Sequence, residues 1–181
     1  MNQNQDFELI NKFSKGDETA FNELVRKYQT KIYWHARRML GSHMDADEVT
    51  QEVLLVLYKK LKNFNFNSSF YTWLYKIVTT RSINLLNRRK VKRFVFINDT
   101  ESQILESESD ITADIDNREK LERLDKILTK LPVKQREVFV LRHFEELSYK
   151  EISEIKGKSV GGLKANYFHA LKKVMELMGN E

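Results

Sequence analysis

The sequence predicts an all-α protein made of two small helical domains joined by an acidic flexible linker. Apolar residues recur at spacings of three and four along most of the chain, which is the pattern of amphipathic helices. The 181 residues include one proline and six glycines, and no long stretch alternates apolar and polar residues as a strand would. The charge changes sign twice, with +8 over residues 1–93, −7 over residues 94–117 and +4 over residues 118–181. Two basic blocks around an acidic strip indicate two modules that each contact a polyanion.

The composition also limits the compartment and the chemistry. Hydrophobic residues make up 41% of the chain, which is enough for a packed core. The chain has no cysteine, so disulfides and thiolate metal sites are excluded and a reducing cytoplasm fits. The N-terminus, MNQNQDFE, lacks the basic region of a signal peptide. The longest apolar run, residues 53–58, is too short to cross a bilayer. We therefore expect a cytoplasmic protein without membrane insertion.

Two helices are expected at the start of the chain. A short one is predicted from Phe7 to Phe13, and it ends at Gly16. Asp17 can cap the second helix, and Gly41 can close it in the left-handed conformation that favours glycine.

The third helix is predicted to begin at Asp45, with Glu48 completing a D-x-x-E capping box. One face of this helix is apolar, and the other is acidic with a single exposed Leu55. Asp45, Asp47, Glu48 and the nearby His43 leave a divalent metal site as an alternative. Capping and the helix dipole already explain carboxylates at a helix N-terminus, so we expect no metal. The acidic face with its leucine fits a partner-docking surface better.

A loop of Phe, Asn and Ser, FNFNSSF at residues 64–70, precedes a long fourth helix from about Ser69 to Arg93. This helix ends in RRKVKR at residues 88–93, with five cations in six residues. The cations could simply stabilise a helix C-terminus. Together with the aromatic loop, they also supply the phosphate neutralisation and stacking surfaces that single-stranded nucleic acid needs. We favour the second interpretation.

The linker is predicted at residues 94–117, which are acidic, serine-rich and sparsely apolar. Fully extended, these 24 residues reach at most roughly 80 Å. Two helices should follow, at residues 118–129 and from Pro132 to about Phe144. Proline is tolerated at a first helical position because the N–H there has no intrahelical partner.

The last part of the chain predicts a helix-turn-helix. Ser148 and Glu151 form a capping box for a short helix, which Gly157 can stop. Ser159 can cap a longer final helix that has a basic face. A short capped helix, a glycine turn and a longer basic helix are typical of DNA-binding proteins, in which the last helix enters the major groove. A plain helical hairpin with solvated lysines is the alternative.

Four stretches of the chain resemble, in order, the bacterial RNA polymerase sigma factors of the extracytoplasmic-function (ECF) group, within the sigma-70 family. They are DADEVTQEVLLVLYKKL (45–61), SFYTWLYKIVTTRSINLLNRRK (69–90), LPVKQREVFVLRHFEELSYKEISEI (131–155) and KSVGGLKANYFHALKKV (158–174). Helix-turn-helices are common, so one stretch alone would say little. Four in this order, with an acidic linker between the second and third, are specific. The resemblance implies a region 2 domain at residues 1–93 and a region 4 domain at residues 118–181.

The resemblance further implies a transcription initiation factor with no catalytic residues and no cofactor. It would bind the clamp of the largest subunit and the flap of the second-largest subunit of core RNA polymerase, contact promoter DNA, and be controlled by an anti-sigma factor. The polymerase-binding positions would be Asp45, Asp47, Glu48, Gln51, Glu52 and Leu55. The minus-10 element would be melted, and a base flipped, by Phe64, Asn65, Asn67, Ser68, Trp73, Lys76, Arg81, Asn84, Asn87 and Arg88. The minus-35 element would be read by Lys158, Ser159, Gly161, Gly162, Lys164, Ala165, Asn166, His169 and Lys172.

Three positions depart from the family pattern. Asn166 and His169 stand where members often carry Arg, and Asn84 stands where they often carry Asp. Because Asn can read adenine with two hydrogen bonds, the family's usual minus-35 sequence does not carry over to this chain, and the base code stays open.

Two other functions remain as alternatives. One is an autonomous helix-turn-helix regulator that binds operators as a dimer, although the acidic face of residues 45–61 has no use on DNA. The other is a metal-dependent nuclease built on Asp45, Asp47 and Glu48.

Overall fold

The structure is a computed structural model that describes residues 3–96 and 115–179, and over these residues the chain forms helices, turns and loops without strands. The all-α prediction is confirmed. The elements, in chain order, are α1 (Gln3–Ser14), α2 (Glu18–Leu40), α3 (His43–Lys60), the 3-10 turn η1 (Leu61–Asn63), α4 (Phe70–Phe96), α5 (Ile115–Thr129), α6 (Val133–Phe139), the π-helical turn η2 (Val140–Phe144), α7 (Tyr149–Lys156) and α8 (Val160–Gly179). Most of the predicted linker, and the side chains of residues 93–121, lie outside the description.

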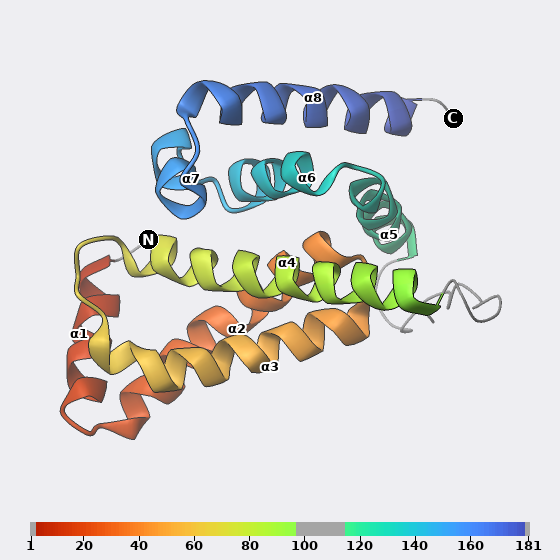
Figure 1. Ribbon diagram of the computed structural model, residues 1–181. Helices are drawn as coiled ribbons and strands as arrows, with labels where there is room; N and C mark the ends of the chain where they lie inside the picture. The colour runs from red at the N-terminus through yellow and green to blue at the C-terminus, as the bar shows by residue number, and fades with distance from the viewer. Residues whose placement is uncertain (1–2, 97–114, 180–181) are drawn as a thin grey trace.

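The first domain packs α2, α3 and α4 together, with α1 across one end (Figure 1). The cap of α2 is the predicted one, since Asp17 accepts a hydrogen bond from the Thr19 N–H at 2.9 Å. Gly41 ends this helix at φ 74°, in the left-handed region. A Cβ at Gly41 would also clash with the Thr129 side chain at the end of α5, so both the backbone conformation and the close packing favour glycine there.

The start of α3 corrects a prediction. Its cap is Ser42, whose hydroxyl accepts from the Asp45 N–H at 3.4 Å. The helix therefore begins almost a turn before the predicted box of Asp45 and Glu48, and that box is wrong. Asp45 becomes the third residue of the helix, and its carboxylate turns toward α4 and binds Arg89.

The second domain contains α5 to α8, and the caps of α7 and α8 follow the prediction. Ser148 and Glu151 form the reciprocal capping box of α7, and Gly157 ends α7 at φ 62°. The Ser159 hydroxyl accepts from the Gly162 N–H at 3.3 Å at the start of α8. Pro132 is the cap of α6 and not its first residue. The apolar periodicity of the last helix would also bury Val160 on its inner stripe, but this side chain is 40% exposed next to the turn.

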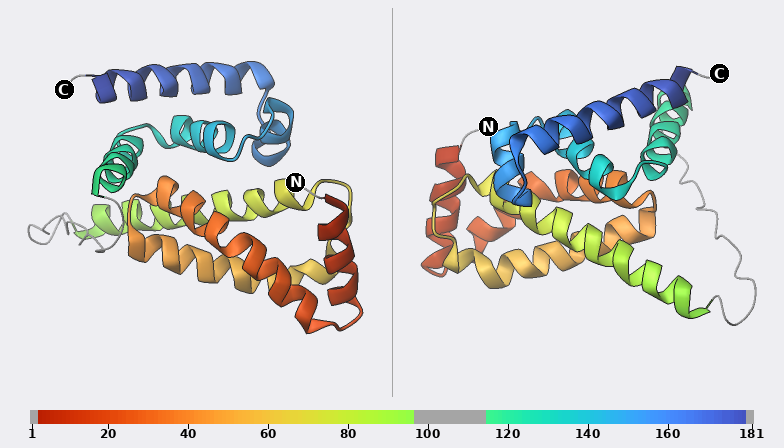
Figure 2. Two further views of the ribbon diagram at one scale, coloured as in Figure 1. Left: turned by 180° about the vertical axis from the view of Figure 1, so that it is seen from behind. Right: turned by 45° about the horizontal axis from the view of Figure 1, so that its top comes forward.

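The two domains lie against each other, with α5 on α2 and α7 on α4 (Figures 1 and 2). One apolar core continues from the first domain into α5 and α6 through Leu128 and Phe139. A second cluster joins Tyr75 of α4 to Leu141 and Ile152. α8 lies on the far side of the second domain, away from α1 to α4, so its outer face is open (Figure 1). Among the described residues, no helix is apolar over a length that would span a membrane.

Candidate nucleic-acid and protein interfaces

The acidic side of α3 faces the basic side of α4. The Glu52 carboxylate lies 3.3 Å from Arg88 Nη2 and 3.8 Å from Arg81 Nη1, and the Glu48 carboxylate lies 3.7 Å from Arg88. Beside these pairs is a groove of about 700 Å³. It is lined by Glu52, Arg81, Asn84, Asn87, Arg88, Val91 and Lys92. Residues predicted to bind polymerase and residues predicted to bind minus-10 DNA therefore share one surface.

Five of the six predicted polymerase-binding residues reach the surface of α3. They are Asp47, Glu48, Gln51, Glu52 and Leu55. Leu55 is 61% exposed, although leucine is the most apolar of the five. An apolar side chain with carboxylates around it is a natural centre for a protein–protein contact, because it can be buried by a partner whose rim is basic.

Asp45 is the exception, since its side chain is buried beneath α4. It is 2% exposed and forms an ion pair with Arg89. Burial raises the pKa of Asp45, and the charge of Arg89 opposes that rise. In this structure Asp45 ties α3 to α4 and lies outside the exposed acidic face.

The loop at residues 64–70 presents an aromatic cluster that the sequence reasoning missed in part. Phe66 is 39% exposed, and its ring centre lies 5.0 Å from the rings of both Phe7 and Phe64. The ring of Trp73 lies 5.3 Å from Phe64. Phe66 also has φ 57°, which is uncommon for a bulky residue and points to a local constraint. The alternation FNFN was a signal for this exposed ring, but the sequence prediction assigned only its neighbours, Asn65 and Asn67 among them, to the minus-10 element.

Most of the predicted minus-10 residues lie at the surface. The exposed ones are Asn65, Asn67, Lys76, Asn84, Asn87 and Arg88, and the half-buried ones are Ser68, Trp73 and Arg81. Phe64 differs, because it is buried at the base of the aromatic cluster and packs 6.2 Å from the ring of Phe70. It supports the loop and leaves Phe66 as its exposed ring.

The predicted minus-35 residues surround the first turns of α8. The exposed ones are Lys158, Ser159, Gly161, Gly162, Lys164, Ala165, His169 and Lys172. No neighbouring atom lies within 4 Å of where a Cβ of Gly161 would be, so nothing inside the protein requires glycine there. Glycine destabilises a helix by up to about 1 kcal/mol relative to alanine, and the close approach of a large partner is a reason to keep it at this position.

Two residues of α8 change the predicted contact set. Asn166 is half-buried, and one N–H of its amide donates to the Gly162 carbonyl at 2.9 Å, which fixes the side chain against its own helix. Phe168 is 63% exposed, between Lys164 and Lys172 on the same face of the helix, and was not predicted. Sequence reasoning passed over it because an aromatic residue in a helix usually belongs to the core.

The family assignment comes from comparison with known proteins. A family model described as Sigma-70 region 2 matches residues 24–91, and one described as Sigma-70, region 4 matches residues 121–174. The ECF RNA polymerase sigma factor SigW of Bacillus subtilis is 33% identical over 162 residues, which are 86% of this chain and 87% of SigW. The chain belongs to the ECF group of sigma-70 family sigma factors. The ECF RNA polymerase sigma-E factor of Escherichia coli is 34% identical over 172 residues, covering 90% of this chain and 88% of that protein.

Solved structures share the fold of this sigma factor. CnrH, in a complex with the cytosolic domain of CnrY, superimposes with a TM-score of 0.72 over 98% of this chain and 99% of CnrH, at 23% identity. The sigma factor RpoE of Bartonella quintana, in a complex with the anti-sigma factor NepR, also gives a TM-score of 0.72, over 89% of this chain and 98% of RpoE, at 19% identity. At these identities, both structures support the fold of the chain and nothing finer.

The family consists of transcription initiation factors, so the assignment favours that function over the two alternatives. The carboxylates of the nuclease alternative each have a nitrogen-bearing side chain of the protein beside them. Asp45 pairs with Arg89, Asp47 lies 3.4 Å from His43, and Glu48 pairs with Arg88. Over the described residues, no three metal-ligating side chains gather into a site.

Proposed function

We propose that this sigma factor binds core RNA polymerase through the exposed side of α3 and places α4 and α8 on the minus-10 and minus-35 elements of a promoter. The observation that carries the proposal is the surface shared by α3 and α4. An acidic face with an exposed leucine adjoins a basic groove and an aromatic loop, so one domain offers a protein contact beside a nucleic-acid contact.

Melting of the minus-10 element is assigned to the loop at residues 64–70 and to α4. Extruding a base costs a few kcal/mol, and stacking on an aromatic ring returns about 1–3 kcal/mol per base. Phe66 and Trp73 supply the stacking surfaces, and Phe64 supports them from below. Arg81, Arg88 and the exposed asparagines of α4 lie where the displaced strand would follow the groove.

The minus-35 element is assigned to the first turns of α8. Lys164 and Lys172 are suited to phosphates, since both side chains are exposed and lie on either side of Phe168 along one face of α8. Ala165, Phe168 and His169 are suited to base edges, with Phe168 and Ala165 as apolar contacts for a thymine methyl. The bond from Asn166 to the Gly162 carbonyl fixes the orientation of the amide and leaves its second N–H and its Oδ1 for a base edge.

The protein partners follow from the same surfaces. We assign the clamp of the largest polymerase subunit to α3 and the flap of the second-largest subunit to the second domain. In the matched structures, CnrH is in a complex with the cytosolic domain of CnrY, and RpoE is in a complex with the anti-sigma factor NepR. We extend an anti-sigma partner of this kind to the present chain and place the protein in the cytoplasm, where the polymerase acts.

The test of polymerase docking uses two exposed residues of α3. Replacing Gln51 and Leu55 together by alanine should weaken co-elution with core polymerase and reduce run-off transcription, because the apolar centre of the face is lost. Glu23→Ala, at an exposed acidic position on α2, is the matched control and should behave as the wild type. Wild-type protein that does not co-elute with core polymerase, yet still binds a promoter duplex, would favour the autonomous regulator.

A further inference from the structure

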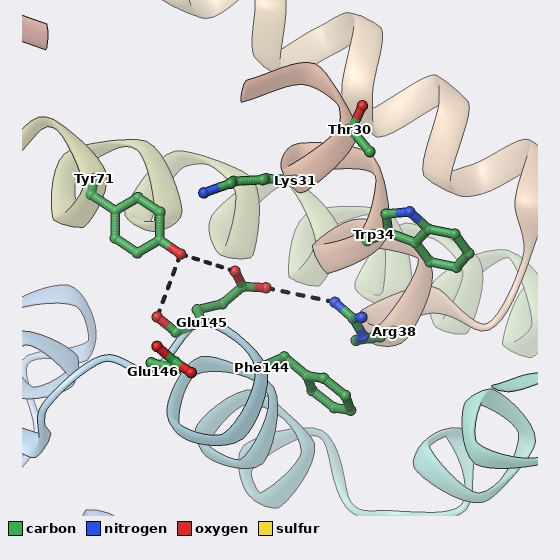
Figure 3. Close-up of a pocket in the computed structure, with 8 residues that line it drawn as sticks. All are labelled: Thr30, Lys31, Trp34, Arg38, Tyr71, Phe144, Glu145 and Glu146. Carbon is green, nitrogen blue, oxygen red and sulfur yellow. Dashed lines mark hydrogen bonds and ion pairs between the residues drawn. The ribbon is translucent and has the colours of Figure 1, made fainter. Parts of the chain in front are cut away.

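A carboxylate of the second domain is buried inside the first. Glu145 follows η2, and its side chain is inserted between α2 and α4 (Figure 3). Its Oε1 lies 3.2 Å from His35 Nδ1, and its Oε2 accepts a hydrogen bond from the Tyr71 hydroxyl at 3.2 Å. Arg38 Nη1 lies 4.0 Å from Oε1. His35 is itself completely buried and reaches Thr79 with its other ring nitrogen at 3.0 Å.

The neighbours of Glu145 fit the same insertion. The guanidinium of Arg38 lies 4.0 Å from the ring centre of Phe144, so this cation contacts both Phe144 and the adjacent Glu145. Glu146 is exposed, with φ 57°, and this left-handed residue turns the chain so that Glu145 points inward. An adjoining cavity of about 410 Å³ is lined by Thr30, Lys31, Trp34, Arg38, Tyr71, Phe144, Glu145 and Glu146 (Figure 3).

Burying a carboxylate is unfavourable unless charge and hydrogen bonds compensate for the lost water. Burial raises the pKa of Glu145, but the hydrogen bond and charge of His35 and the charge of Arg38 outweigh this, and the pKa is lowered overall. The groups that compensate Glu145 all belong to the first domain. When the domains separate, Glu145 exchanges them for water.

The closed arrangement is too small for a promoter, an argument that rests on the proposed function. The names of the two elements place them about 25 base pairs apart, which is about 85 Å at 3.4 Å per base pair. A compact chain of this length has a radius of gyration of about 16 Å and hence a diameter of about 40 Å. Both elements can be occupied together only after the domains move apart.

We propose that Glu145 and its binding site on the first domain form a latch that holds the free sigma factor closed, and that promoter binding at both elements requires the release of this latch. The binding site consists of His35, Arg38 and Tyr71. Glu145 is the charged residue of the second domain that contacts all three of these side chains, and it adds to the apolar packing that also joins the domains.

The test compares Glu145→Gln with Glu146→Gln. The first variant keeps the size of the side chain and removes the charge, and the second makes the same change at the exposed neighbour. The chain has no cysteine, so dyes can be attached at Lys60→Cys on α3 and Glu176→Cys on α8, both exposed. The distance between the dyes reports opening in the free protein, without polymerase or DNA.

Glu145→Gln should lower the ratio of closed to open molecules about tenfold, because a hydrogen bond to a charged acceptor is replaced by a neutral one. Glu146→Gln should match the wild type. Tyr71→Phe, which removes one donor and keeps the ring, should shift the ratio in the same direction by less. If Glu145→Gln is folded by circular dichroism and keeps the wild-type distances, or if it fails to fold and Tyr71→Phe keeps them, the latch is wrong.

Run-off transcription by the wild type with core polymerase tests the proposed function separately. Transcripts from the wild type, together with unchanged dye distances in Glu145→Gln, would overturn the latch alone. Opening of Glu145→Gln without any wild-type transcript would leave the latch standing and remove the proposed function.

Discussion

Phe66 offers a test that separates a role in promoter melting from a role in stability. Replacing it by alanine removes the exposed ring, and replacing it by glycine removes the ring and also the strain of φ 57°. If the ring stacks on an extruded base at about 1–3 kcal/mol, each variant should form open complexes roughly 5- to 150-fold less well. Phe66→Trp should retain most of the activity, because it keeps a stacking surface.

Stability should follow a different order. The Phe66 ring is 39% exposed, so losing its packing on Phe7 and Phe64 should cost both variants about 1–2 kcal/mol. The glycine variant should then be more stable than the alanine variant by about 1 kcal/mol, because only glycine adopts a positive φ freely.

The two properties are measured by open-complex formation with core polymerase on a mapped promoter and by urea unfolding. Equal loss of open complexes in both variants, with unequal stability, is the expected result. Open complexes within twofold of the wild type in Phe66→Ala would refute the stacking role. An alanine variant as stable as the glycine variant would refute the argument from backbone strain.

Three further outcomes are expected. Arg136 donates to the Met39, Thr129 and Leu131 carbonyls at 2.6, 2.6 and 3.2 Å. In urea titrations, Arg136→Ala should therefore lower the free energy of unfolding by about 3–5 kcal/mol, and Arg136→Lys should lower it by less. A loss below about 1 kcal/mol in Arg136→Ala would mean that water replaces these bonds. Lys164→Ala should weaken promoter binding and lower the salt slope by about one, and an unchanged slope would remove Lys164 from the phosphates. Because the pKa of Glu145 is lowered from 4.5, its contribution to stability is present above that pH and is lost as the pH falls through the lowered value. The melting temperature of the wild type should therefore fall more steeply in acid than that of Glu145→Gln. Parallel melting profiles of the two proteins would contradict a lowered pKa of Glu145.

The features predicted correctly from the sequence are mostly local ones. The capping box of Ser148 and Glu151 and the left-handed Gly157 depend on residues three to six positions apart, so their patterns are visible in a single segment. Asp45 shows where local evidence fails. Ser42 is an equally good cap three residues earlier, and the partner that draws Asp45 into the interior, Arg89, is 44 positions away.

The contacts between the domains were outside the reach of the sequence for the same reason. His35 and Glu145 are 110 positions apart, and Arg136 and Met39 are 97 apart. Periodicity assigns a residue to a face of its own helix, but it does not say which other helix covers that face. A histidine and a glutamate that belong to two different basic domains give no signal of pairing until both domains are placed.

The shared surface of α3 and α4 also changes how the predicted sites should be understood. Sequence reasoning divided the residues into a polymerase-binding set and a DNA-binding set, but Glu52 lies 3.3 Å from Arg88 and 3.8 Å from Arg81. A carboxylate that neutralises two cations weakens their attraction for phosphate. Any partner that draws Glu52 away releases Arg81 for DNA and leaves Arg88 paired with Glu48 alone. Under the proposed function, docking on polymerase and capture of the minus-10 strand are therefore linked through one side chain. A change at Glu52 acts on both steps, whereas changes at Gln51 or Leu55 act on docking alone.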